Sequence, residues 1–229
     1  MTKLSRRVFL GSAPAAAAAA GIFGTFFSTA AEAAIKWNET YNVIVIGAGG
    51  AGLSAAVSAK EAGAKKVVVL EKMMFAGGNT IRAGGGFNAA IKADYEKAGI
   101  TDSPKLHAQQ TLAAGDGRGD PVLVHQLAEK APESVQWLKD HGVKFQDHIY
   151  QIYGGLYKRA RNPIGPRGGA YIKALLEVCK KEDIPILCNT RVVEIIREHQ
   201  LSGRVLGVKV EQKGGKTLYL RATNAVVAA

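Results

Sequence analysis

The sequence is poor in the residues that define several protein classes. It has only 2 cysteines, too few for a disulfide scaffold, and no Cys-x-x-Cys-His motif that would attach a c-type haem. Acidic residues are outnumbered, with 19 Asp and Glu against 30 Lys and Arg, and the formal net charge is +11. The basic residues are scattered and form no stripe interleaved with aromatic side chains, so we expect attraction for small anions and no nucleic-acid partner.

The histidines show no spacing typical of a metal site, so we expect no bound metal and place each histidine at the surface or at a helix cap. The five are His107, His125, His141, His148 and His199. The overall composition, 47% hydrophobic and 21% charged, is that of an ordinary globular protein. The two cysteines, Cys179 and Cys188, either form a disulfide in an oxidising compartment or are two small buried thiols.

The N-terminus has the pattern of an export signal. The paired Arg6-Arg7 is followed by Val8-Phe9-Leu10 and then by an apolar, alanine-rich run from Gly11 to Thr29. This order resembles a twin-arginine signal peptide, and Ala31-Glu32-Ala33 fits the small-x-small cleavage rule. We therefore expect residues 1–33 to be removed after Ala33 and the protein to reach the periplasm through the twin-arginine machinery. An uncleaved membrane anchor is the alternative.

The first part of the mature chain reads as a βαβ unit. Residues 41–46 are a β-branched apolar run typical of a strand buried on both faces, and residues 53–62 form an alanine-rich helical pattern that ends at Gly63. A second buried strand over 67–70 ends at Glu71. A strand, a glycine turn, a helix and a strand within about thirty residues indicate a parallel, Rossmann-like sheet.

The turn after the first strand, Gly47-Ala48-Gly49-Gly50-Ala51-Gly52, has the spacing of a dinucleotide-binding loop. The first glycine permits a tight turn, the second allows the backbone to approach a pyrophosphate, and the third lets helix and strand pack closely. The phosphates then lie over free amides at the helix N-terminus. Glu71 can accept hydrogen bonds from ribose hydroxyls, and its charge argues against a 2′-phosphate.

The rest of the chain alternates between helices and strands. We expect a glycine-dense loop over 73–88 and an irregular segment over 150–169, whose Lys158, Arg159, Arg161 and Arg167 either attract an anionic substrate or form a solvated loop. Helices are expected at 101–114, from Asp120-Pro121 onward, at 132–141 and at 170–181. Strands are expected at 185–188, 192–197, 205–211, 217–221 and 225–229; those at 192–197, 205–211 and 217–221 form an antiparallel meander. A chain that stops within a strand suggests a fragment of a longer protein.

A run of three glycines, Gly84-Gly85-Gly86, follows Gly77-Gly78-Asn79-Thr80 in the glycine-dense loop. Three consecutive residues without side chains allow a flat ring to lie against the backbone and present amides to an anion. Asn79, Thr80 and Asn88 can hold polar edges. A flexible loop with no ligand is the alternative interpretation.

Together these segments resemble the flavoprotein subunit of the fumarate reductase/succinate dehydrogenase superfamily, and most closely its soluble periplasmic flavocytochrome c-type branch. The resemblance covers residues 41–229 and includes Glu71-Lys72, Thr101-Asp102-Ser103-Pro104, Ser134-Val135-Gln136-Trp137-Leu138 and Asn189-Thr190-Arg191. It implies an α/β, Rossmann-like FAD-binding domain over 34–229, with a parallel sheet, an antiparallel β-meander insertion, and a clamp domain missing.

The resemblance implies non-covalent FAD held by the glycine turn and the loops around it. Gly84, Gly85 and Gly86 would lie against the flavin ring, with Gly85 also near the substrate, and Val193 would offer its backbone to the adenine. The cofactor-binding residues expected are Gly47, Gly49, Gly50, Ala51, Gly52, Glu71, Lys72, Asn79, Thr80, Gly84, Gly85, Gly86 and Val193.

The resemblance also implies hydride transfer from reduced flavin to the C=C bond of an α,β-unsaturated carboxylate such as fumarate, with electrons from a cytochrome c or a quinol-linked subunit. The family's catalytic residues fall beyond residue 229. Two alternatives stay open: a flavin dehydrogenase or oxidase of the ketosteroid or amino-acid type, and a truncated FAD-binding module with no activity of its own.

Overall fold

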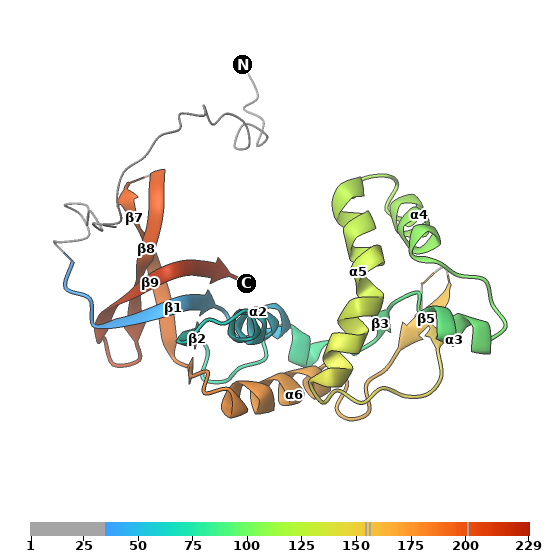
Figure 1. Cartoon of the computed structure of the whole chain (residues 1–229), viewed down its shortest axis with the longest axis horizontal. Helices are drawn as coiled ribbons and strands as arrows, with labels where there is room; N and C mark the ends of the chain where they lie inside the picture. The colour runs from blue at the N-terminus through green and yellow to red at the C-terminus, as the bar shows by residue number, and fades with distance from the viewer. Residues whose placement is uncertain (1–34, 154, 156, 201) are drawn as a thin grey trace, which may run out of the picture.

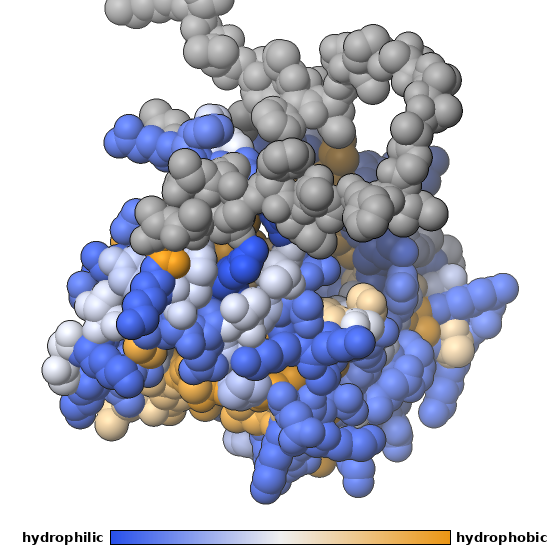
Figure 2. Space-filling view, turned by 60° about the vertical axis from the view of Figure 1, so that its left-hand side comes forward, coloured by the Kyte–Doolittle hydropathy of each residue, from blue (hydrophilic) through white to orange (hydrophobic). Residues whose placement is uncertain are grey.

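The structure is a computed structural model that describes residues 35–229 except 154, 156 and 201. The expected signal peptide, 1–33, lies outside the described residues. Within the described part, no helix is long and apolar enough to cross a membrane. Hydrophilic side chains cover most of the face in Figure 2, as expected from the scattered basic residues.

The molecule is built on one six-stranded mixed sheet with the strand order β6-β2-β1-β9-β8-β7. Its strands occupy the left of Figure 1, and the helices α4 (Pro104–Ala114) and α5 (Pro121–Asp140) stand at the right, with α6 (Gly168–Lys181) running along the base between the two parts. The strands of this sheet are β1 Glu39–Ile46, β2 Val67–Leu70, β6 Ile186–Leu187, β7 Thr190–His199, β8 Ser202–Gln212 and β9 Thr217–Ala228.

The expected βαβ unit is confirmed. Strand β1 pairs in parallel with β2, from Val43 opposite Val67 to Ile46 opposite Leu70, and α2 (Gly50–Glu61) connects them. All four residues of β2 are buried. One face of the two strands packs against α2 and α6, and the other face packs against Val208, Val210 and Leu220 of the meander. Burial on both faces explains why these strands are continuous apolar runs.

The end of the chain differs from the sequence prediction. The strands expected at 217–221 and 225–229 form one strand, β9, which pairs antiparallel with β8 and parallel with β1. The meander is therefore continuous with the parallel sheet. The short polar segment Thr223-Asn224 does not interrupt the strand, because Asn42 Nδ2 from β1 donates to Thr223 Oγ1 at 3.1 Å and to Asn224 Oδ1 at 3.4 Å.

The helical part also differs from the prediction in one respect. The two helices expected from Asp120 and from Pro132 are one helix, α5 (Pro121–Asp140), with Pro132 inside it. Its buried residues Ala128, Ala131, Val135 and Leu138 recur at helical spacing on both sides of the proline. Packing of this continuous apolar face outweighs the hydrogen bond that Pro132 cannot make. The Asp120 cap is as expected, with Oδ1 accepting from Val122 N at 2.9 Å.

A second, three-stranded antiparallel sheet, β3-β5-β4, lies near the base of α5. It draws two strands from the segment 150–169 that we expected to be irregular. The remaining elements are η1 Thr80–Arg82, β3 Phe87–Asn88, α3 Lys92–Lys97, α4 Pro104–Ala114, β4 Tyr150–Gln151, β5 Lys158–Arg161 and α6 Gly168–Lys181.

The two cysteines are free thiols in the structure. Cys179 on α6 is buried in the core beneath the parallel strands, and burial raises the pKa of its thiol to about 11. Cys188 follows β6 and is partly exposed. The reading of Cys179 as a small buried thiol therefore agrees with the structure.

Candidate functional site

A cavity of about 750 Å³ opens at the carboxyl ends of β1 and β2. Its volume is in the range of small-molecule and cofactor sites, and its place is where ligands bind in open α/β sheets. Nine of the residues expected from the sequence line it: Gly47, Gly49, Gly50, Ala51, Gly52, Glu71, Lys72, Asn79 and Thr80.

The glycine turn is shaped by close backbone contacts. Gly47 has a φ of +102°, and a side chain there would collide with the carbonyl of Ala229 at the end of the chain. A Cβ on Gly52 would collide with the carbonyl of Gly47, so this glycine allows α2 to start directly beneath the turn. At Gly49 a Cβ would meet only Gly78 Cα, at 3.9 Å, which leaves the cavity side of the turn open.

The N-terminus of α2 points its amides into this space. Gly49 is the N-cap and has no side chain, so the first turn has no side-chain cap of its own. The amide of Gly50 donates to Thr80 Oγ1 at 3.1 Å. The amides of Ala51 and Gly52 have no hydrogen-bond partner among the described residues. Uncapped amides at the positive end of a helix dipole favour a bound anion.

Glu71 lines the cavity and also accepts a hydrogen bond from the backbone of the glycine turn. Its carboxylate is buried, with a residue exposure of 7%, and Oε2 accepts from Ala48 N at 2.8 Å while Oε1 accepts from Met73 N at 2.8 Å. A carboxylate has about four acceptor positions, so two remain for ligand hydroxyl groups. The sequence predicted only that Glu71 contacts a ligand. The structure shows that its carboxylate also stabilises the glycine turn through the hydrogen bond from Ala48 N.

The triple glycine lies close to the cavity but is not part of its lining. Arg82 is the last residue of this loop that lines the cavity, and Gly84 follows two positions later. Gly84 and Gly86 are exposed, and Gly85 is buried, with its carbonyl accepting a hydrogen bond from the Tyr171 hydroxyl. None of the three amides has a hydrogen-bond partner within the described part of the chain.

The start of β7 contributes to the cavity in a way that only partly matches the prediction. Thr190, Arg191 and Val192 line it, whereas the expected Val193 does not, and the side chain of Val193 is 40% exposed. Thr190 and Arg191 belong to the Asn189-Thr190-Arg191 motif, which is part of the family resemblance noted from the sequence. Met73, Phe75 and Arg82 carried no clear signal in the sequence.

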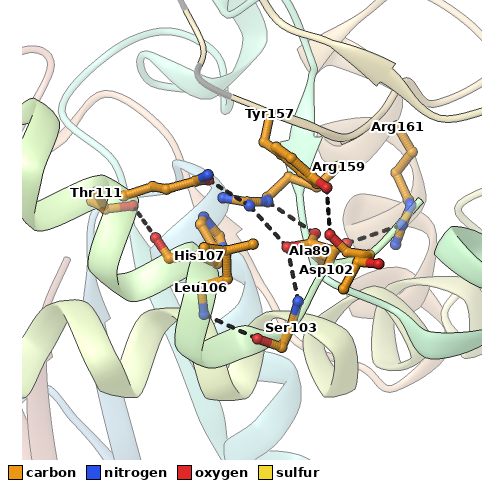
Figure 3. A network of polar contacts seen from close by, with 11 residues as sticks. Ala89, Asp102, Ser103, Leu106, His107, Thr111, Tyr157, Arg159 and Arg161 are labelled. Atoms are coloured by element: carbon orange, nitrogen blue, oxygen red, sulfur yellow. Dashed lines mark hydrogen bonds and ion pairs between the residues drawn. The ribbon is translucent and has the colours of Figure 1, made fainter.

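The basic residues of 158–167 do not all lie in a solvated loop, because two of them, Arg159 and Arg161, are buried and paired with carboxylates. Arg159 and Arg161 on β5 are 5% and 3% exposed. Arg159 makes two hydrogen bonds to the Asp102 carboxylate, of 3.0 and 2.8 Å, and Arg161 pairs with Asp94 at 2.8 Å. Figure 3 shows the Arg159 network between β5 and the start of α4. Lys158 and Arg167 are exposed.

His107 also lies in this network, which corrects the expectation that every histidine is at the surface or a cap. It is 4% exposed on α4, and its Nδ1 is buried without a hydrogen-bond partner among the described residues. Burial lowers the pKa of the imidazole, and the nearby Arg159 charge lowers it further, while Asp102 acts in the opposite direction. Among the described residues no group of three or more His, Cys, Asp or Glu side chains could hold a metal ion.

Comparison with known proteins places this geometry in a family. A family model described as "FAD binding domain" matches residues 42–229. The chain is 37% identical over 176 residues to the fumarate reductase (cytochrome) of Shewanella frigidimarina, covering 76% of this chain and 30% of that protein. It is 34% identical over 191 residues to the urocanate reductase of Eggerthella lenta, covering 82% of this chain and 31% of that protein.

Among solved structures, the open conformation of a flavocytochrome c3 fumarate reductase matches with a TM-score of 0.77 and 31% identity, over 84% of this chain and 34% of that one. A 3-ketosteroid-Δ4-(5α)-dehydrogenase from Rhodococcus jostii matches with a TM-score of 0.75 and 26% identity, over 85% of this chain and 46% of that one. The chain thus spans about a third of the length of the two curated relatives and less than half of either solved structure.

Proposed function

The chain belongs to the FAD binding domain family, and from this premise we propose that it is the FAD-holding part of a reductase that acts on the C=C bond of an α,β-unsaturated carboxylate. Relatives at 30–37% identity include fumarate, acrylate and urocanate reductases. The single observation that carries the proposal is the convergence of the glycine turn, Glu71, Asn79 and Thr80 on one cavity at the carboxyl ends of parallel strands.

The residues present fit a dinucleotide cofactor. The open side of Gly49 and the uncapped amides of Ala51 and Gly52 suit the diphosphate. The remaining acceptor positions of Glu71 suit the hydroxyl groups of the adenosine ribose. Lys72 and Arg191 line the same cavity and add positive charge near the diphosphate.

The loop from Asn79 to Gly86 suits the other half of the cofactor. Asn79 and Thr80 are on the cavity wall, and Gly84, Gly85 and Gly86 form the adjoining backbone without side chains. We place the flavin ring against these three residues, with Gly85 near the substrate and Val193 offering backbone to the adenine. Bound FAD, when reduced, would supply the hydride for the C=C bond. No histidine lies in the loop from Gly77 to Gly86, in keeping with non-covalent binding.

The cellular setting follows from the N-terminal sequence. Arg6-Arg7 and the Ala31-Glu32-Ala33 site support export through the twin-arginine machinery and a periplasmic location. A separate cytochrome c or quinol-linked subunit would then supply the electrons, which is in keeping with the similarity to the fumarate reductase (cytochrome) of Shewanella frigidimarina.

The test is a turnover screen on the protein expressed from its complete reading frame. Reduced viologen is the electron donor, and fumarate, acrylate, methacrylate, urocanate and aryl acrylates are the acceptors. We expect a yellow protein that releases FAD on denaturation and oxidises the viologen with at least one acid. A colourless protein contradicts the cofactor assignment. A flavoprotein that reduces none of the acids contradicts the reaction.

A second candidate function is a flavin dehydrogenase of the ketosteroid type, which the match to the Rhodococcus jostii enzyme favours. A 3-ketosteroid with an artificial electron acceptor belongs in the same screen for this reason. Reduction of the acceptor with the steroid, and no reaction with the acids, would select this candidate. If the complete protein is active and the 229-residue chain alone holds FAD without turnover, the chain is a cofactor-binding module.

A further inference from the structure

A buried hydrogen bond connects helix α6 to the triple-glycine loop. The hydroxyl of Tyr171 donates to the carbonyl of Gly85 at 2.7 Å, and Tyr171 is only 8% exposed. The two residues are 86 positions apart in the sequence. A buried carbonyl that loses its hydrogen-bond partner is unfavourable, so this contact favours one position of the loop.

The first turn of α6 holds the same loop at two further points. The amide of Gly168 donates to the carbonyl of Ala83 at 3.1 Å, and a Cβ on Gly168 would collide with the carbonyl of Thr80. Gly85 has a φ of +87°, and a Cβ there would be 2.8 Å from the carbonyl carbon of Arg167. The backbones of the loop and the helix are therefore in direct contact on both sides of Gly84.

The residues around Tyr171 hold its ring in position and favour the protonated form of its hydroxyl. Its ring lies between Phe87, at a centroid distance of 6.4 Å, and Phe145, at 6.0 Å. Burial and the nearby Tyr150 raise the pKa of the phenol above its usual range, while Arg161 acts in the opposite direction. The net effect favours the protonated hydroxyl, which is the form that donates to Gly85.

The hydrogen bond has a consequence for the next amide. The carbonyl of Gly85 belongs to the same peptide unit as the N–H of Gly86, so holding the carbonyl fixes the direction of that N–H. A hydrogen bond accepted by the carbonyl also polarises the peptide and strengthens the N–H as a donor. Gly86 is exposed, and its amide has no partner within the part of the chain that the structure describes.

We propose that Tyr171 is a positioning residue that orients and strengthens the Gly86 N–H as a hydrogen-bond donor to the flavin ring. This inference rests on the proposed function, because it places the flavin beside Gly84–Gly86. A donor directed at an electron-rich atom of the ring stabilises the reduced, more negative form of the flavin. Tyr171 thus acts on the cofactor through the backbone, without touching it.

The first test is hydrogen exchange of the loop without FAD. Tyr171→Phe keeps the ring and its packing and removes only the donor. We expect exchange of the hydrogen-bonded amides of Ala83 and Gly168, which lie at the contact between the loop and α6, to accelerate about tenfold, the change that corresponds to one hydrogen bond of about 1.4 kcal/mol. Tyr157→Phe is the matched control, because Tyr157 donates to another backbone carbonyl, that of Thr101. Unchanged exchange in Tyr171→Phe overturns the inference.

The second test is the midpoint potential and absorption spectrum of bound FAD in the complete protein. We expect Tyr171→Phe to lower the potential and shift the spectrum, and Tyr157→Phe to leave both unchanged. Replacing Tyr171 with 3-fluorotyrosine keeps the shape and strengthens the donor, so the potential should rise. A faster-exchanging loop with an unaltered potential in both Tyr171 variants shows a structural role only and overturns the inference.

The two proposals fail in distinguishable ways. If the wild-type protein binds no FAD, the proposed function is wrong, and the inference that depends on it falls with it. The exchange experiment then still reports whether Tyr171 holds Gly85. If the wild-type protein binds FAD and reduces an unsaturated acid, but the Tyr171 variants keep its potential, only the inference about Tyr171 is wrong.

Discussion

At the scale of single residues, the glycines of the turn over 47–52 differ in what an added side chain would contact. Gly52 is needed by the fold, because a Cβ there would collide with the carbonyl of Gly47. At Gly49, which lines the cavity, a Cβ would meet only Gly78 Cα at 3.9 Å, so the fold has room for a side chain and we propose that the ligand requires this glycine. The spacing of the motif identifies both glycines, and only the tertiary structure distinguishes what a side chain would meet at each of them.

Alanine substitutions should separate these roles. We expect Gly49→Ala to fold with a melting temperature close to that of the wild type and to lose FAD affinity by tenfold or more. Gly52→Ala should lower the free energy of unfolding by about 2–4 kcal/mol, since α2 must shift away from the turn. Thermal unfolding without FAD and flavin titration measure the two effects. Equal destabilisation by the two variants would contradict the assignment.

His107 should make the folding stability of the protein depend on pH. Its pKa is lowered in the folded protein, so below its ordinary value of 6.5 the unfolded chain takes up a proton that the folded protein resists. Stability that is present above pH 6.5 should therefore be lost as the pH falls from 6.5 toward the lower pKa of the folded state.

We expect His107→Gln to flatten this dependence between pH 7 and pH 5, measured by urea unfolding at pH intervals of half a unit. The exposed His199 on β7 provides the control, and His199→Gln should leave the dependence as in the wild type. A His107→Gln profile as steep as that of the wild type would show that other groups cause the acid sensitivity.

At the scale of elements, helix α5 shows how packing overrides a local break. Pro132 has no amide to donate to the preceding turn and normally ends or kinks a helix. Here the apolar face that contains Ala128, Ala131 and Val135 is buried on both sides of the proline, and the helix continues to Asp140. The cost of the missing hydrogen bond remains in the folded state, where it lowers stability.

Replacing this proline should therefore stabilise the protein. We expect Pro132→Ala to raise the free energy of unfolding by about 1–3 kcal/mol, because alanine restores the amide and relieves the ring contact. Pro121→Ala is the matched control, since Pro121 is at the first helical position, where no intrahelical bond is lost, and it should give no such gain. Urea unfolding of the three proteins measures the difference. A gain of the same size in both variants would point to an effect on the unfolded chain.

At the scale of the whole molecule, two elements join parts that are distant in the sequence. Strand β9 pairs with both β1 and β8 and so makes one sheet from the parallel strands and the meander. Helix α6 packs its buried face under the parallel strands and its first turn against the glycine-rich loop. The cavity is assembled between these parts, from the ends of β1 and β2, the loop after Glu71 and the start of β7.

The proposed export also concerns the whole molecule. Replacing Arg6 and Arg7 with lysine should keep the protein in the cytoplasm, because the twin-arginine machinery reads the arginine pair. Cell fractionation and the mass of the exported protein measure this, and the wild type should begin at Ala34. The matched control is Lys65→Arg with Lys66→Arg, a basic pair outside the signal, which should leave export unchanged. Normal export of the Arg6→Lys, Arg7→Lys protein would contradict a twin-arginine route.

The sequence by itself determined the parts whose physics is local. The glycine spacing of 47–52, the apolar strands around it and the Asp120-Pro121 helix start each depend on neighbouring residues, and each is confirmed. Nine of the thirteen expected cofactor-binding residues line the cavity.

Only the tertiary structure decided the features that depend on partners distant in the chain. Thr223-Asn224 stays within β9 because Asn42 bonds to it from β1, and α5 continues through Pro132 because its face is buried. Arg159 and Arg161 are buried because carboxylates from other segments neutralise them. Bringing such partners together costs chain entropy, and only the contacts of the assembled core offset that cost, so no local pattern of residues reveals them.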